Sequence, residues 1–391
     1  MNRIVITQLN DIKFLLVYEE NVLVECHPLN ENELQIGNIY LGRVQKKVKN
    51  INACFVLLDG DDVGYLPLDN KPYIVTNRQL PNGLASIAES DIILVEVEQE
   101  PIKLKQAKIT GNISLTGRYV VLDLNYGHIG VSKKIGSKER REELTSLINP
   151  TSENNFGCVF RTGCDKADNS DIIAEYEKLS GKLESIIQKA TYEKKTGLIY
   201  KGKPEYINLI DNYGVDRVSE IKTDDEEIYT TLLDYCKENE IKAEVSLYND
   251  EYPYYKLLGL EEDVKKALNK KCWLKSGGFL IIEPTEAMVV IDVNTGKAIE
   301  GKDREKHILK INIEAAKEIA RQLRLRNLSG IIMVDFINMK NEDDKRMVVD
   351  CLKKEFTKDK VSTNFIDITH LDVFEITRKK QKRPLYEIVK L

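Results

Sequence analysis

Two aspartates stand at the ends of two apolar runs of the same design. Residues 288–291 (MVVI) lead into Asp292, and residues 331–334 (IIMV) lead into Asp335. Between them, apolar residues at three- and four-residue spacing predict a helix over 308–326. A strand, crossover helix and strand in this order leave the two strands parallel. Both carboxylates are therefore expected at the carboxyl edge of one sheet, where open α/β sheets bind ligands. Runs this apolar also predict strands buried on both faces.

A carboxylate at the end of a buried strand needs a partner, and a metal ion would be one. Mg²⁺ takes oxygen ligands and is often held by one or two carboxylates together with water and substrate phosphate. Such an ion lowers the pKa of its bound water and stabilises charge on phosphoryl oxygens. Asn294, two residues after Asp292, can offer its amide to the same site. The alternative is an ordinary helix cap or loop hydrogen bond, and the spacing alone leaves both open.

The predicted helix between the two aspartates carries a basic stripe beside its apolar one. A phosphate-binding face and a solvated face with helical ion pairs, for example to Glu314, are about equally compatible with this pattern. If this helix lies beside an acidic metal site, the phosphate-binding interpretation assigns contacts with the RNA backbone to four of its side chains, Lys310, Lys317, Arg321 and Arg324.

The composition excludes several classes of protein. The chain has 391 residues, with 42% hydrophobic and 31% charged residues and a net charge of −5, which suits a globular protein of two or three domains. No apolar run approaches the length of a membrane span, and the N-terminus is a poor signal peptide, so we expect a cytoplasmic protein without membrane contact. The seven cysteines form no CxxC pair, which argues against disulfides and a zinc knuckle. The four histidines form no paired motif, which makes two-imidazole cleavage of RNA an unfavoured mechanism.

The first part of the chain is rich in short strands. Residues 1–25 predict two strands, and residues 36–69 predict three strands separated by glycine turns. With further strands at 91–97 and 113–124, five short strands suggest a small closed barrel of the OB type. Residues 132–156 show no clear period. Further elements are expected as a strand at 158–163 and helices at 171–190 and 257–268.

Three segments carry a resemblance to a known family. They are VVIDVNTGK at 289–297, INIEAAKEIARQLRLRNLSGIIMVDFINM at 311–339 and RPLYE at 383–387. They closely resemble the catalytic core of the bacterial ribonuclease E/G family. The resemblance extends more thinly over most of the chain.

The resemblance implies a multidomain α/β architecture. A ribonuclease H-like subdomain would comprise 1–35 plus 195–270, with an S1-type OB-fold domain at 36–118 inserted. A 5′-phosphate sensor region would follow at 119–194, and a deoxyribonuclease I-like α/β catalytic subdomain at 271–391. The family's C-terminal cysteine motif would begin about where Leu391 stands. We therefore expect no zinc, regard a tetramer as unfavoured and leave a homodimer open.

The resemblance also implies roles for single residues. Asp292 and Asp335 fall on the family's metal-binding aspartates, for Mg²⁺ with Mn²⁺ as a second candidate, and Asn294 falls on its active-site asparagine. Phe55 and Tyr65 fall on aromatic positions of the OB domain that contact RNA, although a place in the barrel core is about equally compatible with Phe55. Further matches are a lysine near the RNA channel and four residues at the 5′-monophosphate, namely Lys105, Gly117, Val121, Arg161 and Thr162.

These matches together imply an endoribonuclease that hydrolyses single-stranded RNA, with a preference for A/U-rich strands and 5′-phosphate and 3′-hydroxyl products. The segment 369–380 departs from the family pattern, which weakens the expected 5′ sensor. One alternative is an RNA-binding regulator with little or no catalysis. A second is a metal-dependent phosphatase or other α/β enzyme acting on small phosphates, against which the predicted barrel argues.

Overall fold

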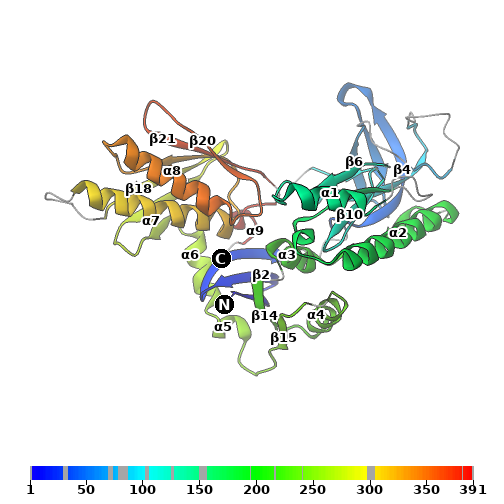
Figure 1. Ribbon diagram of the computed structural model, residues 1–391, viewed down its shortest axis with the longest axis horizontal. Helices are drawn as coiled ribbons and strands as arrows, with labels where there is room; N and C mark the ends of the chain where they lie inside the picture. The colour runs from blue at the N-terminus through cyan, green and yellow to red at the C-terminus, as the bar shows by residue number, and fades with distance from the viewer. Residues whose placement is uncertain are drawn as a thin grey trace. The chain divides into compact units, whose positions relative to one another are not determined.

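The computed structural model describes residues 2–29, 34–68, 74–77, 87–101, 105–124, 127–148, 156–193, 195–214, 217–239, 241–296, 304–380 and 382–389. The chain divides into two compact units, Glu31–Glu205 and a discontinuous unit made of Met1–Asn30 with Tyr206–Leu391 (Figure 1). The four-part division expected from the sequence is finer than this and stays a prediction. No helix in the described ranges is both long enough and apolar enough to cross a membrane.

The unit Glu31–Glu205 contains a closed five-stranded barrel. Its strands follow the order β4-β5-β6-β8-β7, and β7 pairs back onto β4, which closes the sheet. Inward side chains such as Cys54, Val56 and Leu66 are fully buried. The predicted OB-like barrel is therefore confirmed as a closed five-stranded barrel. Its strands are β4 (Ile39–Val48), β5 (Ala53–Leu57), β6 (Val63–Pro67), β7 (Ile92–Gln99) and β8 (Ala107–Thr110), with η1 (Lys49–Ile51) between β4 and β5 and β13 (Gly197–Tyr200) added beside β4.

A second, four-stranded sheet completes this unit, in the order β11-β12-β10-β9. The single strand expected at 113–124 is two strands, because the chain turns back at Gly117 and β9 pairs with β10 in antiparallel register. The helix α1 lies in the stretch where no period was visible, since Leu144 is its single buried residue. The elements are β9 (Ser114–Thr116), β10 (Val120–Asp123), β11 (Ile129–Val131), α1 (Lys138–Ser146), β12 (Gly157–Phe160), η2 (Thr162–Asp165) and α2 (Asn169–Tyr192).

The discontinuous unit has a five-stranded sheet in the order β15-β14-β1-β2-β3. Its N-terminal part contains three strands, one more than the two expected from the sequence. The first strand pairs in parallel with β14, more than two hundred residues further along the chain. The strands are β1 (Asn2–Leu9), β2 (Ile12–Glu19), β3 (Val22–Leu29), β14 (Val218–Thr223) and β15 (Glu244–Leu247), and the helices are α3 (Glu205–Tyr213), α4 (Glu226–Glu238), α5 (Tyr254–Leu257), α6 (Leu260–Leu268) and α9 (Leu385–Ile388).

The same unit has a six-stranded mixed sheet in the order β16-β17-β18-β19-β21-β20. Two helices, α7 and α8, run side by side on one of its faces (Figure 1). The strand–helix–strand prediction is confirmed, because β18 and β19 are parallel and α7 connects them. The elements are β16 (Lys271–Trp273), β17 (Phe279–Pro284), β18 (Met288–Asn294), α7 (Arg304–Leu325), β19 (Gly330–Asp335), α8 (Glu342–Phe356), β20 (Thr363–Ile368) and β21 (Val373–Arg378).

The prediction that β18 and β19 are buried on both faces is wrong. Alternate residues such as Ile291 and Val334 are buried under α7 and α8, but Val290 and Ile331 on the other face are 39% and 49% exposed. The apolar runs led to the wrong prediction because these exposed positions are themselves occupied by apolar residues. The alternation of apolar and polar residues that marks a sheet buried on one face is therefore absent from the sequence. The face opposite the helices, which we call the open face, also carries the two aspartates.

Candidate active site and phosphate-binding residues

The two predicted metal-binding aspartates lie side by side on the open face. Asp292 on β18 and Asp335 on β19 are direct partners in the parallel register, so their strands place them one inter-strand spacing apart, about 4.8 Å. Asp292 is half-buried and Asp335 is exposed. The amide nitrogen of Asn294 donates a hydrogen bond of 2.7 Å to one carboxylate oxygen of Asp292. Asn294 therefore orients Asp292, and the structure brings all three predicted residues together.

The donor set suits a hard divalent cation. Within the described residues, neither carboxylate forms an ion pair, and the single hydrogen bond to either is that from Asn294. Two adjacent carboxylates repel each other unless a proton or a cation lies between them. All available ligand atoms are oxygens, which Mg²⁺ and Mn²⁺ prefer over zinc. The described part of the chain contains no group of three or more His, Cys, Asp or Glu side chains placed so that they could hold one metal ion. A metal here would therefore depend on two carboxylates together with water or substrate oxygens.

A buried asparagine that the sequence analysis missed holds the chain beyond Asp335. Asn312 on α7 is fully buried, and its amide donates to the Ile337 carbonyl at 2.7 Å while accepting from the Ile337 N–H at 3.2 Å. This pair of bonds fixes the segment that follows β19. A polar residue next to the apolar stripe of a helix was the signal available in the sequence, and helical periodicity alone could not separate it from a solvated position.

The turn before β17 is also fixed from α7. Glu314 accepts hydrogen bonds from the backbone N–H groups of Lys275 at 2.6 Å and Ser276 at 3.2 Å. The sequence pattern suggests Glu314 as a partner for helical ion pairs. Its carboxylate instead binds the backbone of the β16–β17 turn, which sets the position of both strands relative to the helix.

The predicted basic stripe on α7 is shorter than expected. Lys310 and Lys317 are exposed, as RNA-backbone contacts require. Arg324 is 6% exposed, and Arg321 donates to Glu318 at 2.6 Å and to the Leu23 carbonyl at 2.6 Å. The interpretation of these two arginines as solvent-facing RNA contacts is therefore corrected. The side of α7 that carries Arg321 and Arg324 faces the sheet that contains β3, in the same unit. Helical periodicity shows that a helix has such a face but not which sheet packs against it.

The two aromatic residues predicted on the barrel form a pair on its outer side. Phe55 on β5 and Tyr65 on β6 are cross-strand partners, and their ring centroids lie 6.0 Å apart at an interplanar angle of 57°. Both are half-buried, and neither belongs to the barrel core, so the core interpretation of Phe55 does not hold. Lys105 is exposed just before β8. Their contact with RNA stays a prediction.

The four residues predicted at a 5′-phosphate lie in or directly beside the sheet β11-β12-β10-β9, and the N–H groups of Gly117 and Arg161 are already used by backbone carbonyls. The Arg161 guanidinium donates to the Gly117 carbonyl at 2.5 Å, and the hydroxyls of Thr162 and Ser132 are 3.2 Å apart. The Gly117 N–H donates to the Val120 carbonyl at 2.8 Å. Val121 is half-buried within β10. A phosphate held here would therefore depend on the side chains of Arg161 and Thr162, and Gly117 would contribute no N–H in this arrangement.

Glu175 on α2 closes this turn, and the sequence analysis did not find it. Its carboxylate accepts three backbone hydrogen bonds, from Arg118 at 2.7 Å, Tyr119 at 2.7 Å and Val120 at 2.9 Å. A Cβ atom at Gly117 would lie 2.5 Å from that carboxyl group. The position therefore requires glycine so that the carboxylate can approach the backbone. An acid on a helix gives no sign in the sequence that it binds a distant turn.

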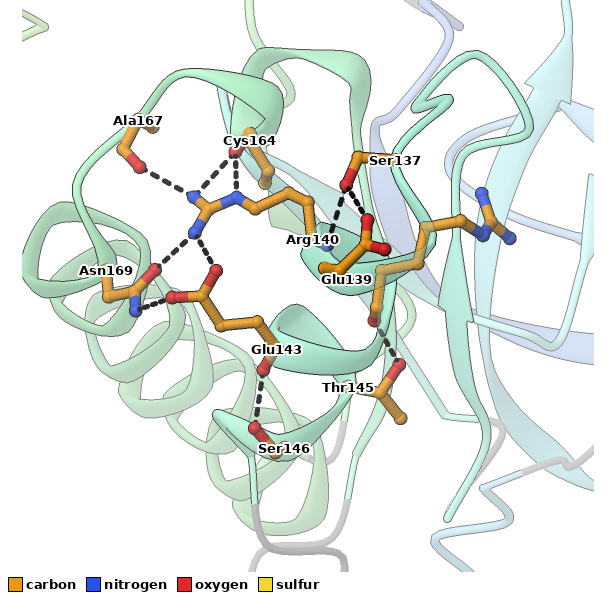
Figure 2. A network of polar contacts seen from close by, with 10 residues as sticks. Ser137, Glu139, Arg140, Glu143, Thr145, Ser146, Cys164, Ala167 and Asn169 are labelled. Carbon is orange, nitrogen blue, oxygen red and sulfur yellow. Dashed lines mark hydrogen bonds and ion pairs between the residues drawn. The ribbon is translucent and has the colours of Figure 1, made fainter.

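Arg140 on α1 holds the loop that carries Arg161 and Thr162 (Figure 2). Its guanidinium donates to the carbonyls of Cys164 at 2.7 Å and Ala167 at 2.6 Å, and to the side chains of Glu143 and Asn169 at 2.8 Å each. Figure 2 shows these acceptors converging on the one guanidinium from α1, from the segment before α2 and from the first residue of α2. Arg140 is therefore a positioning residue for the loop, with its donors directed inward.

The cysteines of this unit have no exposed thiol in the described residues. Cys158 and Cys164 are fully buried, and burial raises the pKa of their thiols to about 12 and about 11. Such thiols are almost entirely protonated at neutral pH and are poor nucleophiles and poor metal ligands. Cys158 and Cys164 are therefore ordinary core residues of this unit.

A closed OB-like barrel in one unit and an in-register aspartate pair on an α/β sheet in the other define a mixed α/β protein with several sheets. Residues 114–381 match the sequence model of the Ribonuclease E/G family. Ribonuclease G of Escherichia coli (strain K12) is 30% identical over 379 residues, which cover 94% of this chain and 78% of that protein.

Two other relatives agree. Ribonuclease G of Haemophilus influenzae is 31% identical over 393 residues, which cover 97% of this chain and 79% of that protein. Ribonuclease E of a Nostoc species is 33% identical over 363 residues, which cover 90% of this chain and 52% of that protein. This chain belongs to the Ribonuclease E/G family, as the sequence resemblance predicted.

Proposed function

We propose that this chain is an endoribonuclease that hydrolyses internal phosphodiester bonds of single-stranded RNA with the aid of a divalent metal ion. The in-register pair of Asp292 and Asp335 carries the proposal, because two adjacent carboxylates without a cationic partner among the described residues suit a metal at a phosphate. The ribonuclease names of the relatives support the substrate class.

The residues of this site would have separate roles in binding the metal ion, orienting its ligand and binding the RNA backbone. Asp292 and Asp335 would hold Mg²⁺ or Mn²⁺, and Asn294 would keep Asp292 in the ligating orientation through its 2.7 Å hydrogen bond. A bound ion would supply charge stabilisation at the phosphate and a water of lowered pKa. Lys310 and Lys317 would contact backbone phosphates, which makes binding salt-dependent. We expect 5′-phosphate and 3′-hydroxyl products and a preference for A/U-rich strands, as the family implies.

The unit Glu31–Glu205 would bind RNA but would take no part in the cleavage. Phe55 and Tyr65 can stack on bases, and stacking needs no particular sequence. Arg161 and Thr162 would bind a 5′-monophosphate, with Lys105 on the path of the strand. The finer architecture belongs to the same proposal, with an S1-type barrel at 36–118, a sensor region at 119–194, a ribonuclease H-like part at 1–35 with 195–270 and a deoxyribonuclease I-like part at 271–391.

A binding protein without catalysis is the main alternative. A protein that only binds RNA gains nothing from two uncompensated acids on the open face, because they would repel phosphate. The aspartate pair therefore favours the enzyme over the regulator.

A cleavage assay separates the two. A 5′-monophosphorylated, end-labelled single-stranded RNA is incubated with wild type, Asp292→Asn, Asp335→Asn and the control Asp350→Asn, which changes an exposed acid on α8. We expect internal cuts that need Mg²⁺, vanish with chelator and fall at least about a hundredfold in the first two variants, while the control stays active. RNA that is retained by the protein but never cut would support the regulator. A 5′-hydroxyl substrate and Arg161→Ala then test the sensor separately.

A further inference from the structure

The edge strand β16 presents an aromatic side chain that the core does not use. Trp273 is 64% exposed, and it is the single tryptophan of the chain. Large aromatic side chains left exposed on a sheet commonly mark a binding surface, since burying them elsewhere would stabilise the fold. The neighbouring position Cys272 points to the opposite side, where its sulfur lies 3.2 Å from Glu318 on α7. Trp273 therefore belongs to the open face.

A second ring and a cation complete this surface. Trp273 and Phe279 on β17 are cross-strand partners with ring centroids 5.3 Å apart in an edge-to-face arrangement. The ammonium group of Lys271 lies 4.0 Å from the Trp273 ring centroid and 3.8 Å from that of Phe279. Lys271 is exposed. Two rings with a cation over them offer both a stacking surface and a positive charge.

The register places this cluster in line with the aspartate pair. Trp273, Phe279 and Asn294 are consecutive partners across β16, β17 and β18. The neighbouring row across the same strands runs from Lys271 through Ile281 to Asp292 and on to Asp335. Cross-strand partners share a face, so the rings and the carboxylates lie on the same side of the sheet. Two inter-strand spacings, about 10 Å, separate the strand of Trp273 from that of Asp292.

We propose that Trp273, Phe279 and Lys271 form a stacking platform for a base of the single-stranded RNA whose phosphodiester lies at Asp292 and Asp335. The inference rests on the proposed function, since it assumes that RNA occupies the aspartate pair. Every base has a π face that can stack on an indole, and the lysine complements the adjacent phosphate. A purely apolar partner would leave the Lys271 charge uncompensated. The platform would hold the strand in register at the cleavage site.

The single tryptophan is a built-in reporter for this platform. Asp292→Asn protein, with a divalent ion present, is titrated with a short single-stranded RNA while the tryptophan emission is recorded. We expect saturable quenching of the emission, and reduced access of acrylamide to the ring at saturation. A set of RNAs with one abasic site each should lose the quenching at one position near the scissile bond. Saturated RNA binding, measured by filter retention, with unchanged emission would overturn the proposal.

Cleavage kinetics provide the second arm. Trp273→Ala should raise KM about 5- to 150-fold, the range expected for one lost base stack, with a smaller change in kcat. Trp273→Phe should recover much of the loss because it keeps a stacking ring. The control Tyr386→Ala removes an exposed aromatic residue of α9 and should leave KM unchanged. Equal KM for wild type and Trp273→Ala would overturn the proposal. The proposed nuclease activity is tested separately by the loss of cleavage in Asp292→Asn.

A last arm tests whether a protein covers this face instead. If the emission changes with protein concentration in the absence of RNA, and sedimentation shows self-association that Trp273→Ala abolishes, a second copy of the chain occupies the platform and the RNA proposal is wrong. Emission that is independent of protein concentration is the result we expect.

Discussion

Acidic side chains are used in opposite ways in the unit Glu31–Glu205 and on the open face of the other unit. In the unit Glu31–Glu205, Glu175 and Glu96 are enclosed by donors, the first by three backbone N–H groups and the second by the N–H and hydroxyl of Ser114. On the open face of the other unit, Asp292 and Asp335 stand next to each other with a single amide as donor among the described residues. Enclosed carboxylates hold the backbone in place, whereas adjacent carboxylates without donors need a ligand.

The largest expected effect on stability is at Glu175. Glu175→Ala leaves three N–H groups of the 118–120 turn without their acceptor, and we expect a loss of about 3 kcal/mol of unfolding free energy. Urea unfolding followed by circular dichroism measures this loss. The control Glu177→Ala removes an exposed acid of the same helix and should be nearly neutral. Equal stability of the two variants would show that the turn does not depend on the carboxylate.

The second prediction concerns the pH dependence of stability that arises from Glu96, an enclosed carboxyl group that is 9% exposed. Burial raises the pKa of this carboxyl to about 7 in the folded protein, from an ordinary value of 4.5. The folded state then binds the proton more tightly than the unfolded state, so the stability from this group is present below pH 4.5 and is lost as the pH rises to 7. We expect wild type to lose on the order of 1–3 kcal/mol relative to Glu96→Gln between pH 5 and pH 8.

Unfolding midpoints in urea at the two pH values test this prediction. Glu142→Gln serves as the control, because Glu142 is a 70% exposed acid on α1. A wild type that follows Glu96→Gln in parallel across the pH range would mean that the Ser114 hydrogen bonds fully compensate for the burial.

The stability of the protein should depend on a divalent metal ion through Asp292 and Asp335, but not through the enclosed carboxylates Glu175 and Glu96. Mg²⁺ at ten times its dissociation constant should stabilise wild type by about 1.4 kcal/mol. Asp335→Asn should lose this gain, yet it should be at least as stable as wild type in chelator because one of two repelling charges is gone. Scanning calorimetry with and without Mg²⁺ measures both effects. If Asp335→Asn gains as much from Mg²⁺ as the control Asp350→Asn, the ion binds elsewhere.

The smallest expected effect is at the exposed lysines of α7. Lys317→Ala should weaken RNA binding a few-fold and reduce the slope of log affinity against log salt by about 0.7, the value for one phosphate contact on a single strand. Lys242→Ala, an exposed lysine before β15, should leave the slope unchanged. Filter binding from low to high salt distinguishes them. Identical slopes for the two variants would remove α7 from the RNA-binding surface.

The same contrast explains what the sequence could predict. Asp292, Asn294 and Asp335 were predictable because strand ends follow from local apolar runs, and the parallel crossover then fixes which ends meet. Arg321 and Arg324 were misinterpreted because helical periodicity locates a face but not the sheet that packs against it. Glu175 and Arg140 were missed because their partners lie far from them or have no side-chain signature, being backbone groups of a turn and a loop. The open face was missed because its exposed positions are apolar.

The parallel pairing of β1 with β14 has a consequence for the newly made chain. The strands β1 to β3 leave the ribosome before the unit Glu31–Glu205, and the partner strand of β1 follows only after the whole of that unit has been synthesised. The pairings of the intervening unit, including that between β4 and β13 near its two ends, involve residues made before β14. The edge of β1 therefore stays unpaired on that side while more than two hundred further residues are synthesised, and pairings over such sequence separations form slowly. Slowing of synthesis within the intervening segment would lengthen the period in which that edge is open to wrong partners.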